Sequence, residues 1–288
     1  MFLPVLAIAC AGLVYFARAP LLVVEDAYFT SLYGADRTRM SRIRASLTLF
    51  RPVRSVVLVD TLGPDGIAFA VSEASSQPYA VFFPYRYRAG AERYADQQTG
   101  TAVAVFAGTQ QPEPPLNDRI RYFITDRTAD MYRSGLAAAI LSENSPDRVV
   151  CCLSNSADGR FRDAFLRGLR DGGHNQDPIY VDPDADYPYS ESFAAAVIAD
   201  PTDRFFQKKN PAPTVLHSWI NPELTNSQVK IIFDDAPWAL LAGGVRNLSG
   251  RVGTVYLPSK AAVMDRRLAG GTVKRSLQAA AGANFTAE

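Results

Sequence analysis

Short apolar runs alternate with helical patterns along most of the chain. Continuous apolar runs rich in β-branched and aromatic residues are typical of strands that a parallel sheet buries on both faces. After residue 54 these runs are Val56–Asp60, Tyr79–Phe83, Thr101–Phe106, Arg121–Thr125, Arg148–Leu153, Pro178–Val181, Thr214–Ser218, Val229–Phe233 and Gly253–Leu257. Helical patterns lie between them at Gly66–Ser75, Met131–Ser142, Gly159–Asp171, Ser190–Ala199 and Ser259–Ala269. The alternation predicts right-handed βαβ units and doubly wound parallel sheets, and so an α/β fold.

The N-terminus has a different pattern. Phe2–Ala17 is apolar apart from Tyr15, and the hydrophobicity resumes at Leu21–Val24. This length lies near the lower limit of roughly 17 residues for a membrane-spanning helix. We interpret residues 1–24 as a signal anchor or transmembrane segment. A processed signal or lipoprotein signal at Cys10, and a buried or peripheral helix, remain alternatives.

Residues 25–53 carry apolar side chains near helical spacing with arginines between them. We interpret this segment as an amphipathic helical linker. Its arginines form either a solvated helix face or a patch that contacts anionic lipid headgroups. Arginines on this side of the apolar segment also favour a cytoplasmic side, which opposes an extracytoplasmic body.

Composition narrows the function classes. The chain has 288 residues, enough for two lobes, and its 30 basic and 29 acidic side chains leave a net charge of +1. This balance provides no general attraction to nucleic acid, so we expect no nucleic-acid partner. The three cysteines and two histidines are not spaced as ligands of a zinc site, and we expect neither metal nor cofactor.

No catalytic constellation stands out. Gly63–Gly66 lacks both the dinucleotide fingerprint and the lysine of a phosphate-binding loop. Ser154 and Ser156 lack the nucleophile-elbow pattern, and neither histidine has a recognisable partner. We therefore expect a protein that is not an enzyme.

Polar and aromatic side chains follow several predicted strands. In open α/β sheets, ligands bind outside the carboxyl ends of the strands. Carboxylates can hydrogen-bond ligand hydroxyls there, and aromatic rings can cover a flat apolar ring face. The candidates are Asp60, Asp126 and Asp234, with Tyr85, Tyr87 and Trp219 as aromatic walls. The competing interpretation is that the aspartates are helix caps or turn residues.

Four stretches resemble type I periplasmic binding proteins, a group that includes ribose and galactose receptors, basic-membrane-protein-like nucleoside receptors and the effector domains of lactose-repressor-like regulators. They are Asp126–Ser142, Arg148–Gly173, Phe233–Pro237 and Gly253–Pro258. The second is similar to the family's strand, polar loop and arginine-bearing helix, which adds Arg160 and Arg162 as candidates. The chain departs from the pattern between Ser218 and Val229, where no full helix fits, and after Gly270, where no final strand is evident.

The resemblance implies two lobes, of which residues 54–125 plus 258–288 form the first and residues 126–257 the second. It implies an extracytoplasmic solute-binding protein, tethered through its N-terminus, that captures a small polar ligand such as a sugar or nucleoside between hinged lobes. A membrane permease or a sensor would be its partner. The alternative is a membrane-anchored structural or interaction protein that kept the fold and lost its ligand.

Overall fold

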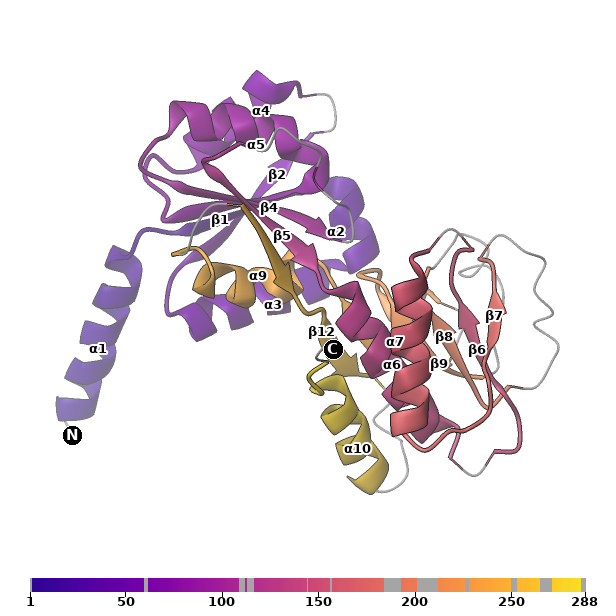
Figure 1. The fold of residues 1–288 in the computed structure, drawn as a ribbon. Coiled ribbons are helices and arrows are strands. Elements are labelled where there is room, and N and C mark those ends of the chain that lie inside the picture. Colours follow the sequence, from indigo (N-terminus) through magenta and orange to yellow (C-terminus); the bar gives the residue numbers. More distant parts are fainter. Residues whose placement is uncertain are drawn as a thin grey trace. The chain divides into compact units, whose positions relative to one another are not determined.

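The computed structural model shows a chain divided into two compact units (Figure 1). It describes residues 2–59, 62–108, 112, 117–143, 145–155, 157–183, 193–200, 212–225, 228–249, 253–264 and 271–285. Unit 1 comprises Met1–Thr125 and Ala236–Leu257, and unit 2 comprises Asp126–Asp235 and Pro258–Glu288. The polypeptide therefore passes between the units three times.

Unit 1 contains a sheet of parallel strands in the order β11-β5-β4-β3-β1-β2. Its first strand lies inside the sheet and pairs with β2 on one side and β3 on the other. Because this strand is covered on both edges and both faces, its first four residues, Leu21–Val24, form a continuous apolar run. The strands are β1 (Leu21–Asp26), β2 (Val53–Leu58), β3 (Ala80–Pro84), β4 (Ala102–Gly108), β5 (Ile120–Thr125) and β11 (Gly253–Leu257).

Helices cover both faces of this sheet (Figure 1). On one face lie α4 (Pro64–Ala74) and α5 (Arg88–Gln97), whose side chains pack on Leu22 and Phe83 in one buried cluster. On the other face lie α3 (Ala35–Leu49) and α9 (Pro237–Arg246). The short elements α2 (Ala27–Tyr33) and η1 (Tyr85–Tyr87) follow the carboxyl ends of β1 and β3.

Helix α9 approaches the sheet closely through Gly244. A Cβ atom at this position would lie 3.1–3.3 Å from the rings of Phe82, Phe106 and Phe123. The three rings pack against one another, with centroids 5.4 Å apart for both Phe82–Phe106 and Phe106–Phe123. The chain that returns from unit 2 therefore completes the core of unit 1.

Helix α1 (Phe2–Ala17) precedes the sheet and contacts α3 near its carboxyl end. The Tyr15 hydroxyl lies 2.9 Å from Ser46 Oγ, and the Tyr15 ring packs on Phe50 with centroids 5.9 Å apart. Arg18 donates to the Phe50 carbonyl oxygen over 3.2 Å. Within the described part of the chain, no helix has both the length and the apolar character needed to cross a membrane.

Unit 2 repeats this architecture with the strand order β12-β10-β9-β8-β6-β7. Again the first strand of the unit, β6, lies between the next two, and all pairs are parallel except β10 with antiparallel β12. The strands are β6 (Val149–Cys152), β7 (Ile179–Val181), β8 (Ala195–Ile198), β9 (Pro213–His217), β10 (Gln228–Asp234) and β12 (Lys260–Val263). Between β9 and β10, the described residues 218–225 contain the short turn η2 (Pro222–Leu224) and no longer helix.

Two helices of unit 2 pack backbone to backbone. These are α6 (Arg127–Leu141) and α7 (Gly159–Asp171), and α10 (Gly271–Ala281) lies against α6. A Cβ atom at Gly135 would overlap the carbonyl oxygen of Phe165, and one at Gly168 would overlap that of Tyr132. Glycine at both positions permits this approach, because each lacks the side chain that would hold the helices apart.

The structure corrects the interpretation of residues 1–53. Leu21–Asp26 is a fully buried strand of the sheet, so the predicted anchor over residues 1–24 runs four residues too far. The segment predicted as a linker forms α2 and α3, which connect β1 to its neighbour β2. A four-residue apolar run close after an apolar helix carries no period of its own, which is why the strand was missed.

Two predicted helices are strands instead. Ala195–Ile198, within predicted helix Ser190–Ala199, is the central strand β8, and Lys260–Val263, within predicted helix Ser259–Ala269, is the edge strand β12. Alanine favours helices, but here strand pairing with neighbours on both edges of β8 overrides that preference. The remaining residues of both segments lie outside the described ranges, apart from those next to the strands.

The lobes also differ from the prediction. Residues 236–257 belong to unit 1, because α9 covers its sheet and β11 pairs with β5. Residues 258–288 belong to unit 2, because β12 pairs with β10 and α10 packs on α6. The prediction assigned both segments to the opposite lobes.

We expect N-terminal deletions to separate α1 from β1. Removal of residues 1–18 leaves the sheet of unit 1 complete, whereas removal of residues 1–24 takes four of the six residues of β1 out of its interior. The shorter deletion should retain cooperative unfolding of unit 1 in a urea titration that is monitored by the fluorescence of Trp238. The longer one should abolish it, and equal behaviour of the two would contradict the assignment of β1.

The α6–α7 contact predicts that one added methyl group at Gly168 strongly lowers the free energy of unfolding. Gly168→Ala should lower the free energy of unfolding by about 3 kcal/mol or more, because the backbones must separate. Gly159→Ala in the same helix is the control, since a Cβ atom there meets nothing within 4 Å. Urea titrations followed by circular dichroism measure both, and a cost for Gly168→Ala as small as that of the control would refute the close contact.

Candidate functional site

Each sheet contains one pair of neighbouring strands from which the chain continues toward opposite edges of the sheet. In unit 1 this switch point lies between β1 and β3, and in unit 2 between β6 and β8. Crevices outside the carboxyl ends of strands at such switch points are the usual ligand sites of open α/β sheets. We call the residues at and just after the carboxyl ends of the parallel strands, around each switch point, the strand-end surface of that unit.

The strand-end surface of unit 1 centres on Asp26, the last residue of β1. Its carboxylate is buried and accepts three hydrogen bonds: from Phe29 N over 2.6 Å, from Arg86 Nη1 over 2.7 Å and from the Tyr87 hydroxyl over 3.3 Å. The Arg86 side chain remains 48% exposed. A buried carboxylate therefore fixes an arginine whose side chain is still half exposed.

A second buried acid lies beside it. Glu25, in β1, accepts a hydrogen bond from Trp238 Nε1 over 2.9 Å, and both side chains are buried. This bond joins β1 to the start of α9 and satisfies a carboxylate that burial would otherwise penalise. We assign Glu25 a structural role.

The predicted candidates of unit 1 have different positions. Tyr87 is buried in the core and its hydroxyl donates to Asp26, so it supports the site rather than forming a wall of it. Tyr85 is half-buried at the start of η1 and packs against the same core. Asp60 lies outside the described residues.

The strand-end surface of unit 2 centres on Arg127 and Asp200. Arg127 Nη2 donates to Asp200 Oδ1 and, over 3.0 Å, to the Ala199 carbonyl oxygen. Asp200 Oδ2 accepts a hydrogen bond from Ser154 N over 2.9 Å, which joins the ends of β6 and β8. The Arg127 guanidinium also lies over the Phe161 ring, 5.3 Å from its centroid. An ion pair and an aromatic ring thus meet at the switch point.

A histidine lies next to this ion pair. His217 ends β9, stacks on Phe233 with centroids 5.0 Å apart and shares a hydrogen bond with Ser134 Oγ. Burial lowers the pKa of His217 to about 3, and the positive charge of Arg127 acts in the same direction. His217 is therefore neutral over the physiological pH range.

The inner face of α6 carries a further polar cluster. Asp130 is buried and pairs with Arg133 Nη1 over 3.0 Å, and Arg133 Nε donates to the Ala283 carbonyl oxygen over 2.9 Å. Burial raises the pKa of Asp130 to about 6, although a hydrogen bond with Ser259 and the charge of Arg133 lower it. This cluster ties the C-terminal segment to α6.

The two predicted aspartates of unit 2 both lie at strand ends. Asp126 is the N-cap of α6 and accepts a hydrogen bond from Ala129 N over 3.2 Å, as the competing interpretation expected. Asp234 is the last residue of β10 and is buried opposite Lys260 of β12. The next residue, Asp235, has its pKa raised by burial.

The remaining predicted residues of unit 2 follow β6 and β9. Trp219 is half-buried directly after β9. Arg160 is exposed and pairs with Asp158 in the first turn of α7, over 2.6 Å. Arg162 donates to Asn155 Oδ1 over 3.2 Å and lies over the Tyr180 ring, 5.1 Å from its centroid. Of the two arginines, Arg162 is the one held against the loop that follows β6.

Sequence reasoning missed Asp26, Arg86 and Asp200 because it did not recognise two strands. Once β1 and β8 are read as strands, a common pattern appears in which an apolar run ends on aspartate. It occurs at Asp26, Asp126, Asp200 and Asp234. That repetition is the feature of the sequence that could have located both ion pairs.

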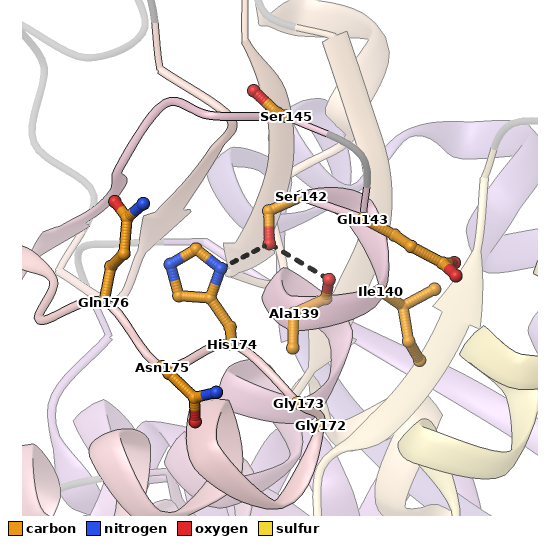
Figure 2. Close-up of a pocket in the computed structure, with 10 residues that line it drawn as sticks. All are labelled: Ala139, Ile140, Ser142, Glu143, Ser145, Gly172, Gly173, His174, Asn175 and Gln176. Carbon is orange, nitrogen blue, oxygen red and sulfur yellow. Dashed lines mark hydrogen bonds between the residues drawn. The ribbon is translucent and has the colours of Figure 1, made fainter.

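One cavity lies away from the strand-end surfaces (Figure 2). It has a volume of about 600 Å³ and lies at the carboxyl ends of α6 and α7. His174 Nδ1 and Ser142 Oγ are 3.1 Å apart on its wall, and Ser142 Oγ donates to the Ala139 carbonyl oxygen. None of the predicted site residues lines it. In the described ranges, no group of three or more His, Cys, Asp or Glu side chains is placed to hold a metal ion.

Comparison with known proteins identifies the fold. The sequence matches no protein-family model and no curated protein. Among solved structures, the chain is similar to an ABC-transporter solute-binding protein from Conexibacter woesei, with TM-score 0.57, 11% identity and coverage of 91% of this chain and 94% of that one. It is also similar to a transcriptional activator of the comK gene from Bacillus halodurans, with TM-score 0.55, 12% identity and coverage of 91% and 95%.

The neutral state of His217 predicts a pH dependence. The folded chain binds no proton at His217 until the pH approaches 3, whereas the unfolded chain binds one near pH 6.5. His217 therefore contributes stability above about pH 6.5 that is lost as the pH falls, by about 1.4 kcal/mol per pH unit. His217→Gln should unfold in urea with a correspondingly flatter profile between pH 6 and pH 4. Parallel profiles for the two proteins would contradict the burial of a neutral imidazole.

Proposed function

Because the chain has the fold of type I periplasmic binding proteins, we propose that it is a non-enzymatic binding protein whose strand-end surfaces take up a small polar ligand. The observation that carries this proposal is the recurrence of one arrangement in both units. At each switch point an aspartate next to the strand end holds an arginine, namely Asp26 with Arg86 and Asp200 with Arg127.

The ion pairs suit recognition of hydroxyl groups. A guanidinium group has five N–H donors in a fixed plane, and Asp26 engages Arg86 while half of that side chain stays exposed. Because Asp26 already orders the Arg86 side chain, a ligand that contacts its exposed part does not have to order it first. Ligands rich in acceptor oxygens fit this chemistry.

Aromatic side chains supply the apolar part of such a site. Phe161 lies beneath Arg127, and Trp219 is half-buried after β9. A flat ring face rests well on such side chains while its hydroxyls reach polar neighbours. We therefore propose a sugar or a nucleoside as the ligand class, with Asp126 and Arg162 as further polar contacts.

We further propose an extracytoplasmic location and delivery of the ligand to a membrane permease or a sensor. The similarity to a solute-binding protein of an ABC transporter supports this role. The net charge of +1 is consistent with a function that does not involve nucleic acid.

Ligand binding can be tested by thermal shift. Sugars, nucleosides and amino acids are screened against the full chain, and one class should raise the melting temperature. A ligand at 100 times its dissociation constant stabilises the folded state by about 2.7 kcal/mol. Trp219→Ala should abolish or weaken the shift without loss of folding, because its side chain is partly exposed. Arg86→Lys should also weaken the shift, because lysine keeps a positive charge beside the buried Asp26 but lacks the planar donors of the guanidinium group.

Phe69→Ala is the matched control for these variants. Phe69 is 66% exposed on α4, outside the strand-end surfaces, so its loss should leave the ligand shift unchanged. If no ligand class stabilises the wild-type chain, or if the shift survives both site variants, the proposed site is wrong.

A second function is favoured by a specific observation. Several strand-end groups are already paired within the chain: Asp26 accepts three donors, and Asp126 caps α6. This supports a structural or interaction protein that retains the fold without a ligand. A null result in the ligand screen, together with normal cooperative unfolding, would favour this alternative.

A further inference from the structure

Helix α3 presents large apolar side chains to solvent. Met40, Ile43 and Leu47 are 58%, 42% and 71% exposed, whereas the residues that α3 buries are Thr38 and Ala45. A helix at the surface of a globular domain normally has the opposite distribution, with its apolar stripe facing the core. The exposed stripe therefore calls for a partner outside unit 1.

Arginines flank this stripe. At about 100° per residue, Met40, Ile43 and Leu47 fall within about 60° of one another on the helix surface. The exposed residues Arg39 and Arg44 lie on the two sides of that arc. The helix contains four arginines and one aspartate, a net charge of +3, although the whole chain carries only +1.

Helix α1 adds exposed apolar side chains near the end of α3. Tyr15 of α1 contacts Ser46 and Phe50, so the carboxyl end of α1 lies beside the carboxyl end of α3 within unit 1. In α1, Leu13 is 73% and Phe16 is 79% exposed, and Arg18 follows at the end of the helix. Apolar side chains bordered by arginines thus extend over both helices.

From this arrangement we infer that α3 and the end of α1 form a docking surface for an anionic lipid bilayer. Met40, Ile43 and Leu47 enter the boundary between headgroups and acyl chains, and Arg39 and Arg44 bind lipid phosphates on either side. Helices that lie in the membrane interface combine an apolar face with flanking basic residues in this way. Arginine stems can also cover apolar surface while their guanidinium groups reach the headgroups.

The charge distribution favours lipid over the other occupants. In a symmetric pair of chains joined through this stripe, Arg39 and Arg44 of one copy would approach those of the other, and like charges oppose such an interface. A nucleic acid would bind the arginines but would leave the apolar stripe exposed between them. An anionic bilayer satisfies both parts of the surface.

The test is sedimentation of the full chain with vesicles. Wild-type protein should bind vesicles of phosphatidylcholine with phosphatidylglycerol more tightly than vesicles of phosphatidylcholine alone. Arg39→Gln with Arg44→Gln should weaken binding to the anionic vesicles about 30-fold, and added salt should weaken the wild type in the same direction. Ile43→Ser with Leu47→Ser should weaken binding to both vesicle types at least about 10-fold.

Two control variants separate this surface from exposed apolar and basic side chains elsewhere in the chain. Phe69→Ser and Arg170→Gln remove an exposed apolar and an exposed basic side chain elsewhere, and both should bind as the wild type does. All variants should keep wild-type unfolding in urea, because every altered side chain is exposed.

Three results would overturn the inference. The first is that the wild type does not bind anionic vesicles. The second is that the α3 variants bind as tightly as the wild type, which would leave α1 as the sole contact. The third is that the wild type self-associates without lipid and that the α3 variants abolish this association. None of these results concerns the strand-end surfaces, so the ligand screen tests the proposed ligand site independently of the lipid experiment.

Discussion

The interior position of β1 is the constraint on which unit 1 depends. Its six residues pair with β2, the first three also pair with β3, and all six are buried, so the sheet forms only when Leu21–Asp26 is extended. The same pairing places Asp26 at the switch point, beside the end of β3 and the turn that carries Arg86. Packing of the core and construction of the strand-end surface are therefore consequences of one strand.

Unit 2 shows the same relation between fold and charge. Strand β6 lies between β7 and β8, and the ends of β6 and β8 are joined through Asp200, which accepts from Ser154 N and holds Arg127. A charge near the interior requires a partner, because burial of an unpaired ion is costly. The pairing makes both arrangements stable, and it also orients each arginine.

The helices fall into two groups by what they bury. Helices α6 and α7 bring their backbones into contact at Gly135 and Gly168, so the faces that they share are buried within unit 2. Helix α3 instead buries Thr38 and Ala45 and leaves Met40 and Leu47 at the surface. This distribution is the opposite of that of a helix whose apolar stripe faces the core of its own domain.

The sequence is enough to predict the α/β class, most strands after residue 54 and the positions of Asp126 and Asp234 at strand ends, because a continuous apolar run that ends on a polar residue is a local pattern. It could not determine that Leu21–Asp26 and Ala195–Ile198 are strands. A short apolar run after an apolar helix, or one rich in alanine, has no period that separates strand from helix. The ion pairs Asp26–Arg86 and Asp200–Arg127 and the lobe that each C-terminal segment joins were decided only by the tertiary structure, since they depend on the order of strands in a sheet and not on neighbours in the chain.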